Sequence, residues 1–143
     1  MNEPTSADAA LLERGRQVLA RQPFSVLVGA RLTRFEPGFA ELTLPLRDDL
    51  LQQHGFAHGG VVSYCADNAL TYAAGGSTQG SVMTSEFKIN FVRPAVGDEL
   101  IARASVVHAG RSQIVVRCDI SVAKAGLEKL CAVAQGTVAV VSS

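Results

Sequence analysis

One stretch of the chain, from Gln52 to Gly76, constrains the fold more than any other. It holds a His-Gly-Gly sequence at residues 58–60 and then an apolar helical pattern that carries a single acid, Asp67. Adjacent glycines at a helix start cost backbone entropy, but they let another group approach backbone N–H donors at the positive end of the helix dipole. Such donors suit an oxyanion. Burying a carboxylate among apolar residues is costly unless the carboxylate is hydrogen-bonded or has a function. This segment is therefore expected to carry an active site.

The segments before this helix contain one helix and one hairpin. Residues 7–20 have the spacing of an amphipathic helix, and Pro23 is expected to break that pattern. A strand then runs from about Val28 to Phe35, and a Glu-Pro-Gly turn joins it to an alternating apolar run over residues 39–46. This alternation predicts a β-hairpin.

The central helix is expected over about residues 59–74, and Gly75 and Gly76 are expected to end it in the left-handed conformation. Short glycine-containing turns separate the four alternating runs that follow, over residues 83–92, 99–108, 112–123 and 128–141. Short connections favour antiparallel pairing. The order predicts an α+β fold in which a curved antiparallel sheet wraps around one long helix, with the N-terminal helix as a cap.

Length and composition limit the classes of protein to consider. The 143 residues fit a single domain over residues 1–143, with the N-terminal helix at about 7–22 and the core at about 28–141. Thirteen basic and thirteen acidic residues cancel, so no nucleic-acid partner is expected. The polar N-terminus and the lack of a run of about 20 apolar residues predict a cytoplasmic protein without a membrane partner. Three cysteines without C-x-x-C spacing support neither disulfides nor a zinc site.

The run HGGVVSYCADNALTYAAG, followed by MTSEFKINFVRPA and GDEL, resembles the hotdog-fold acyl-CoA thioesterases of the phenylacetate-degradation (PaaI) type. The resemblance extends from about Arg31 to Val140, and its most specific element is His-Gly-Gly with an Asp nine residues after the His. It implies a hotdog fold and hydrolysis of a small-molecule acyl-CoA to the free acid and CoA, with no further cofactor. It also implies a homodimer or homotetramer, because in this family the acid faces the glycine end of the partner's helix.

The resemblance assigns roles at both ends of the motif. The Gly59 N–H would polarise the thioester carbonyl, Gly60 would allow close packing beside the substrate, and His58 would orient the helix start and line the pocket. Asp67 would either attack the carbonyl or deprotonate a water, and the sequence does not separate these roles. Alternatively, Asp67 belongs to a polar stripe with Ser63 and Thr71 that faces water.

Two further polar positions follow from the same resemblance. An amide six residues before the His would hold the water or the carbonyl; this is Gln52, with Gln53 beside it as the alternative. A hydroxyl ten residues before Pro94 is Thr84, with Ser85 as a second substrate-binding candidate. Strict alternation places Thr84 on a polar face with Glu86, Lys88 and Asn90, and Ser85 with Phe87, Ile89 and Phe91.

Basic residues are candidates for the phosphates of CoA. They are Arg93, Arg111 and Lys124, of which Arg111, in a Gly-Arg turn, is the best placed by the resemblance. His54 and His58 lie four residues apart, but no third ligand stands at a suitable spacing, so no metal site is expected.

Two other functions fit the same scaffold. A hydratase or dehydratase would need a catalytic His paired with an acid, and an acyl-CoA-binding sensor would keep the pocket without the chemistry. The run over residues 83–92 is the candidate for an unpaired edge strand, which two-fold pairing between subunits would close.

Overall fold

The computed structural model of the chain describes residue 3 and residues 5–142. The helices are α1 (Ser6–Ala20), α2 (Pro23–Val28) and α3 (Gly59–Gly75), with a short 3₁₀ helix at Asp48–Leu50. The strands are β1 (Arg31–Glu36), β2 (Phe39–Pro45), β3 (Ser81–Phe91), β4 (Glu99–Ala109), β5 (Gln113–Lys124) and β6 (Leu127–Ser142). None of the helices in this described part combines the length and hydropathy needed to cross a membrane.

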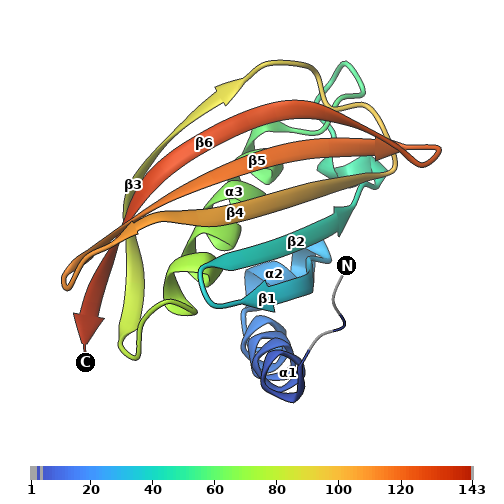
Figure 1. Cartoon of the computed structure of the whole chain (residues 1–143). Coiled ribbons are helices and arrows are strands. Elements are labelled where there is room, and N and C mark those ends of the chain that lie inside the picture. Colours follow the sequence, from blue (N-terminus) through green and yellow to red (C-terminus); the bar gives the residue numbers. More distant parts are fainter. Residues whose placement is uncertain (1–2, 4, 143) are drawn as a thin grey trace.

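The six strands form one antiparallel sheet in the order β1-β2-β4-β5-β6-β3. The sheet curves around α3, which lies in its concave side (Figure 1). β3 follows α3 in the chain but pairs with the last strand, so it forms one edge of the sheet. The predicted hotdog arrangement is confirmed, and so is the prediction that residues 83–92 belong to an edge strand.

The core between α3 and the sheet is built from small side chains on the helix. Cys65, Ala66, Ala69, Ala73 and Ala74 of α3 have no exposed surface. Because these side chains are short, the helix backbone can lie close to the sheet. Every second residue of the central strands faces the helix, as a half-buried sheet requires; the fully buried ones include Leu42, Leu100, Ile114, Val116 and Ile120.

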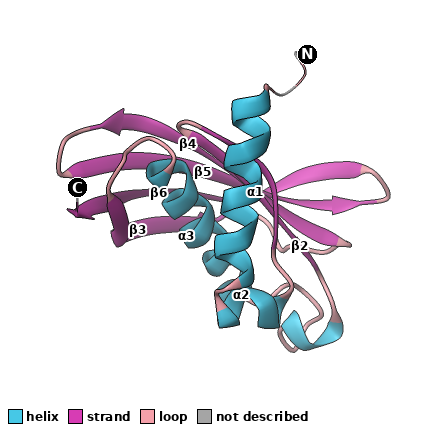
Figure 2. Cartoon of the chain, turned by 90° about the horizontal axis from the view of Figure 1, so that it is seen from below, coloured by secondary structure: helices cyan, strands magenta, loops and turns pink. Residues whose placement is uncertain are grey.

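The N-terminal helix packs on the β1 edge of the sheet, next to α3 (Figure 2). Thr5 caps its start in a capping box with Asp8. The Tyr72 hydroxyl on α3 donates a 2.8 Å hydrogen bond to the carbonyl of Gly15 on α1. A Cβ on Gly15 would lie 2.6 Å from Leu32 Cδ2, so a larger residue here would displace either α1 or the β1 side chains. The described part of α1 is thereby fixed to both layers.

The first helix ends at Ala20, before Pro23, as the sequence predicted, but Pro23 itself begins α2, since proline suits the first turn of a helix. The predicted start of the first strand at Val28 was therefore wrong, and the strand starts at Arg31. The predicted left-handed end of the central helix was also wrong. Gly76 ends α3 with a φ of −74°, in the right-handed region. A Cβ on Gly76 would lie 2.7 Å from a ring carbon of Phe35, so close packing, and not a left-handed turn, requires glycine here.

The edge strand β3 departs from strict alternation. Its pairing register with β6 shifts between Thr84 and Glu86, which marks a β-bulge. As a result Thr84 is half-buried on the inner side, Ser85 is exposed, and Phe87 turns inward again. The predicted grouping of Thr84 with the outward polar residues was therefore wrong. On β6, a Cβ on Gly136 would lie 2.6 Å from the Glu86 carbonyl oxygen, so the bulge needs a glycine opposite it.

Candidate active site

Asp67 lies in the middle of α3 and is held by a threonine of the edge strand. The Thr84 hydroxyl donates a 2.8 Å hydrogen bond to Asp67 Oδ1. The Thr71 hydroxyl, one helical turn further along, donates to the Asp67 carbonyl at 2.8 Å and lies 2.9 Å from Thr84 Oγ1. Asp67 is half-buried and is thus not simply part of a water-facing stripe. Within the described residues Asp67 Oδ2 makes no hydrogen bond and is available to a ligand.

A hollow of about 400 Å³ opens beside this carboxylate, and we call it the Asp67 pocket. One wall comes from α3 and the other from the first half of β3. Its lining consists of Tyr64, Asp67, Asn68, Thr71, Val82, Met83 and Thr84. The pocket therefore combines one acid with neutral polar groups and two aliphatic side chains.

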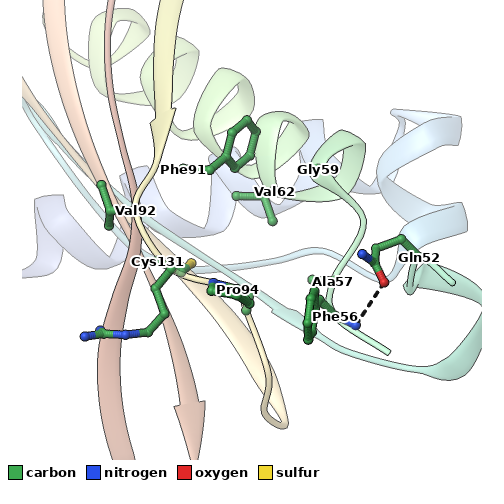
Figure 3. Close-up of a pocket in the computed structure, with 11 residues that line it drawn as sticks. Gln52, Phe56, Ala57, Gly59, Val62, Phe91, Val92, Pro94 and Cys131 are labelled. Carbon is green, nitrogen blue, oxygen red and sulfur yellow. Dashed lines mark hydrogen bonds between the residues drawn. The ribbon is translucent and has the colours of Figure 1, made fainter. Parts of the chain in front are cut away.

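A second hollow, of about 410 Å³, lies at the start of α3, and we call it the Gly59 pocket (Figure 3). Its lining comes from the loop before α3, from the first turn of α3, from the end of β3 with the segment that follows, and from one residue of β6. The lining residues are Gln52, Phe56, Ala57, Gly59, Val62, Phe91, Val92, Arg93, Pro94, Ala95 and Cys131. This pocket contains the predicted donors but not Asp67.

The start of α3 leaves one backbone donor free. His58 is the N-cap, and its Nδ1 accepts a 2.8 Å hydrogen bond from the Gly60 N–H. The Gly59 N–H donates to no group in the described residues. A Cβ on Gly59 would meet only Phe91, at an ordinary 3.5 Å, whereas one on Gly60 would lie 2.9 Å from His58 Nδ1. Contacts within this chain thus require glycine at position 60 for the cap, but not at position 59.

His58 is exposed and belongs to the lining of neither pocket. Its observed contact is the cap on α3, which agrees with the predicted orienting role and not with the implied place in the pocket wall.

The structure distinguishes Gln52 from Gln53. Gln52 is half-buried and lines the Gly59 pocket, while Gln53 is exposed. The Gln52 side-chain carbonyl accepts hydrogen bonds from the backbone N–H groups of His54 and Phe56, the second of which is drawn in Figure 3. With its oxygen held by the loop, the Gln52 amide nitrogen has no partner in the described residues and can donate to a ligand.

The acid and the donors do not meet within one chain. The two pockets share no lining residue, and Asp67 lies in one while Gly59 and Gln52 lie in the other. β3 borders both: Val82, Met83 and Thr84, near its start, line the Asp67 pocket, and Phe91, at its end, lines the Gly59 pocket.

The candidate cations lie at different ends of the sheet. Arg93 lines the Gly59 pocket and donates a 3.0 Å hydrogen bond to the Leu130 carbonyl. Arg111 is in the turn between β4 and β5. The next residue, Ser112, accepts a backbone hydrogen bond from the Val140 N–H of β6. Val140 pairs with Val82 of β3, which lines the Asp67 pocket, so the turn lies at the Asp67 end of the sheet. Lys124 is exposed at the end of β5. Neither Arg111, Lys124 nor the exposed Ser85 lines either pocket.

Sequence reasoning missed two polar residues of the Asp67 pocket, Tyr64 and Asn68. Both are half-buried on α3, and the Asn68 amide donates a 2.9 Å hydrogen bond to the Tyr64 hydroxyl. Tyr64 lies three residues before Asp67 and four before Asn68, the spacings that bring helix side chains onto one face. That spacing was the available signal.

The cysteines do not supply a nucleophile. Cys131 lines the Gly59 pocket but is only 1% exposed, and burial raises the pKa of its thiol to about 11. Burial also raises the pKa of Cys65 to about 12. At neutral pH such groups stay protonated. Among the described residues, no three His, Cys, Asp or Glu side chains form a group that could hold a metal ion.

Solved structures show the same fold class. A thioesterase family protein from Silicibacter pomeroyi superposes with a TM-score of 0.89 at 36% identity, covering 93% of this chain and 99% of that one. The PaaI protein of Escherichia coli superposes with a TM-score of 0.84 at 22% identity, covering 96% of this chain and 98% of that one. The molecule is therefore a hotdog-fold protein with an acid on its central helix.

Sequence comparison identifies the family. Residues 54–129 match the thioesterase superfamily. A Saccharolobus solfataricus protein named as an esterase, SSO1253, is 32% identical over 124 residues, which are 85% of this chain and 79% of that protein. The acyl-coenzyme A thioesterase PaaI of Escherichia coli K12 is 34% identical over 95 residues, 65% of this chain and 66% of the relative. The chain belongs to the thioesterase superfamily, within which it is a PaaI-type hydrolase of thioester bonds.

Proposed function

We propose that the protein hydrolyses an acyl-CoA at a site shared between two subunits, with Asp67 from one and Gly59 and Gln52 from the other. The observation that carries the proposal is the division of acid and donors between two pockets that border opposite ends of the edge strand β3. One chain thus holds two half-sites. The relative named as an acyl-CoA thioesterase supports the choice of substrate class.

Pairing of β3 with its own copy would join the half-sites. β3 hydrogen-bonds to β6 on one side only, and Met83 and Phe91 are 65% and 55% exposed. In a two-fold antiparallel pair, the first half of one strand faces the second half of the other. The Thr84 region, with Asp67 behind it, would then face the partner's Phe91 region, with its Gly59 pocket. The same pairing removes an edge that would otherwise invite aggregation.

The reaction follows from the groups so assembled. The thioester carbonyl oxygen accepts hydrogen bonds from the Gly59 N–H and the Gln52 amide, which stabilise the negative charge that forms on it. In one route Asp67 Oδ2 takes a proton from a water while the water oxygen attacks the carbonyl carbon; the C–S bond then breaks, and the leaving thiolate of CoA takes that proton from Asp67. In the other route Oδ2 attacks the carbon itself and the C–S bond breaks to give an anhydride and the thiolate; the water that opens the anhydride supplies the proton of the thiol. Thr84 keeps Oδ1 occupied, so that Oδ2 faces the substrate.

The two arginines at opposite ends of the sheet support the same assembly. Self-pairing of β3 would place Arg93 of one subunit and Arg111 of the other at the same end of the shared site. A guanidinium group can donate two parallel hydrogen bonds to the oxygens of one phosphate. We therefore propose both as contacts to the phosphates of CoA. The chain itself provides acid, donors and amide, so we expect no requirement for a metal or another cofactor.

A test of the shared site uses two inactive variants with different tags. The first is Asp67→Asn and the second is the double variant Gln52→Ala with Gly59→Pro, which removes the N–H at the first position of α3, where proline fits a helix. They are co-expressed, and mixed dimers are purified through both tags. Each mixed dimer would have one site with all groups intact, so about half of the wild-type activity should return. Mixed dimers as inactive as the parent proteins would show that acid and donors act within one chain.

A further inference from the structure

We propose that Asn68, held in place by Tyr64, Ser25 and Gln22, selects acyl groups that carry a hydroxyl on the acyl chain close to the thioester. This inference rests on the proposed function, because it places the acyl chain in the Asp67 pocket. It adds a specificity-determining residue and a substrate class.

A directed chain of hydrogen bonds fixes the Asn68 side chain. Its amide nitrogen donates to the Tyr64 hydroxyl at 2.9 Å and to Gln22 Oε1 at 3.2 Å. The Tyr64 hydroxyl donates to Ser25 Oγ at 2.6 Å, and Ser25 donates to Gln22 Oε1 at 2.6 Å. Each donor therefore has an acceptor, and the amide nitrogen of Asn68 must point toward α2. Its carbonyl oxygen consequently points away from α2.

That oxygen is a free acceptor. Asn68 Oδ1 accepts no hydrogen bond from the described residues. Every fully buried side-chain oxygen and nitrogen in this part of the chain has a partner, so the unpaired Oδ1 lies where solvent reaches it. Asn68 lines the Asp67 pocket, which makes the pocket the place where a ligand can meet this acceptor.

The surroundings make the acceptor selective. Phe24 of α2 packs on the Tyr64 ring with a centroid distance of 5.3 Å, and burial raises the pKa of the Tyr64 hydroxyl, which therefore stays protonated. Val82 and Met83 form the wall from β3. A hydroxylated chain could place its methylenes on these two residues and donate its proton to Asn68 Oδ1. An unsubstituted chain would displace water from Oδ1 without donating a hydrogen bond in its place, which costs binding free energy.

Helix geometry limits where the hydroxyl is placed. Asp67 and Asn68 are neighbours in sequence, and both lie within one helical turn of Tyr64, where Cβ atoms are about 5–6 Å apart. A chain whose carbonyl carbon lies at Asp67 can therefore reach Asn68 with a hydroxyl a few bonds away. The pocket volume of about 400 Å³ fits a short or medium acyl group. We expect the 3- or 4-position to be preferred over the chain end.

The test compares hexanoyl-CoA with its 3-, 4- and 6-hydroxy derivatives as kcat/KM on the wild-type protein. The 3- or 4-hydroxy compound should be hydrolysed about tenfold faster than hexanoyl-CoA, the usual scale for one satisfied acceptor. In Asn68→Leu, which keeps the side-chain volume but not the acceptor, the ratio of hydroxylated to plain substrate should fall by the same factor. A variant that is merely impaired would lose both activities and keep the ratio.

Two controls sharpen the outcome. Tyr64→Phe keeps Asn68 Oδ1 but removes the hydroxyl that accepts from the Asn68 amide. The ratio of kcat/KM on hydroxylated to plain substrate should therefore fall less than in Asn68→Leu. Gln135→Leu, an equivalent change on exposed β6 surface, should leave the ratio unchanged. Equal rates on plain and hydroxylated chains in the wild type would overturn this inference even if Asn68→Leu fails to fold. Activity on no acyl-CoA at all would overturn the proposed function, and this inference with it.

Discussion

The Thr84 hydroxyl donates a 2.8 Å hydrogen bond to Oδ1 of Asp67 and so connects the edge strand of the sheet to the acid of the central helix. The bond exists because a β-bulge turns Thr84 inward at the position where alternation would turn it outward. Position and orientation of the carboxylate thus depend on the shape of β3, the strand that we propose as the subunit interface.

Asp67→Asn should lower kcat by about 10²-fold or more, the scale expected for a positioned acid, base or nucleophile. The substitution is nearly isosteric, so the fold should persist. The measurement is thiol release from a panel of acyl-CoAs with EDTA-treated protein, with circular dichroism to verify folding. Near wild-type turnover by a folded variant would remove Asp67 from the mechanism.

Thr84→Val keeps the shape of the side chain but removes the donor to Asp67. We expect kcat to fall about tenfold, less than in Asp67→Asn, because the acid remains but is less well oriented. Ser85→Ala is the matched variant one residue along, on the exposed side of the strand. Steady-state kinetics of the pair separate the two hydroxyls; a larger loss in Ser85→Ala would assign the role to Ser85.

Gly136→Ala should reduce both stability and activity. The new Cβ would lie 2.6 Å from the Glu86 carbonyl oxygen, so β3 must move at the bulge, at a cost of about 1–3 kcal/mol. Urea denaturation and kcat measure the two effects. Gly126→Ala provides a comparison, since no atom lies within 4 Å of a Cβ there and only its φ of +80° opposes the change. It should destabilise without slowing the folded enzyme.

Arg93→Ala and Arg111→Ala should each raise KM for acyl-CoA with little change in kcat. A phosphate contact remote from the carbonyl binds the substrate and the transition state alike. Arg34→Ala serves as the control because Arg34 is exposed on β1, at the edge of the sheet opposite to β3. A large loss of kcat at constant KM would instead place an arginine in the chemistry.

Stability should fall as the pH rises above about 9. Burial raises the pKa of Cys65 to about 12 and of Cys131 to about 11, whereas the thiols of the unfolded chain ionise near pH 8.5. Because the folded pKa is the higher one, these thiols stabilise the fold below the unfolded pKa and lose that effect as pH rises toward the folded pKa. Urea midpoints between pH 7 and 10 should drop more for the wild type than for Cys65→Ala. An equal decrease of the urea midpoint in both proteins would show that the Cys65 thiol does not contribute to the pH dependence.

The sequence predicted the helices and strands well where apolar residues recur at regular helix or strand spacing. The helix over residues 59–74 and the last four strands match α3 and β3–β6 within a few residues. Thr84 was selected by its distance from Pro94 and by a strict alternation; the structure places it beside Asp67, but a bulge interrupts that alternation. A bulge depends on pairing with β6 and is not visible in the sequence of β3 alone. α2 was missed because Pro23 can both end and begin helical structure.

Residue types and spacing selected the candidate residues, whereas the division of the site between two subunits was expected only from the family resemblance. Sequence could not choose between Gln52 and Gln53, since both amides precede the same loop and only the fold buries one of them. Nor does spacing along the chain show that Asp67 and Gly59, eight residues apart on one helix, open into separate pockets. The roles of all these residues stay predictions for the experiments above.

The row of alanines on α3 has a consequence for how such a protein can diversify. Since Ala66, Ala69 and Ala73 are fully buried, replacing any of them by a larger residue would push the acid-bearing helix away from the sheet. Substitutions by larger residues are therefore tolerated least on the buried face of this helix. New substrate ranges would arise instead at Val82 and Met83, the apolar residues of the β3 wall of the Asp67 pocket, where side chains can change size while the reactive groups keep their positions.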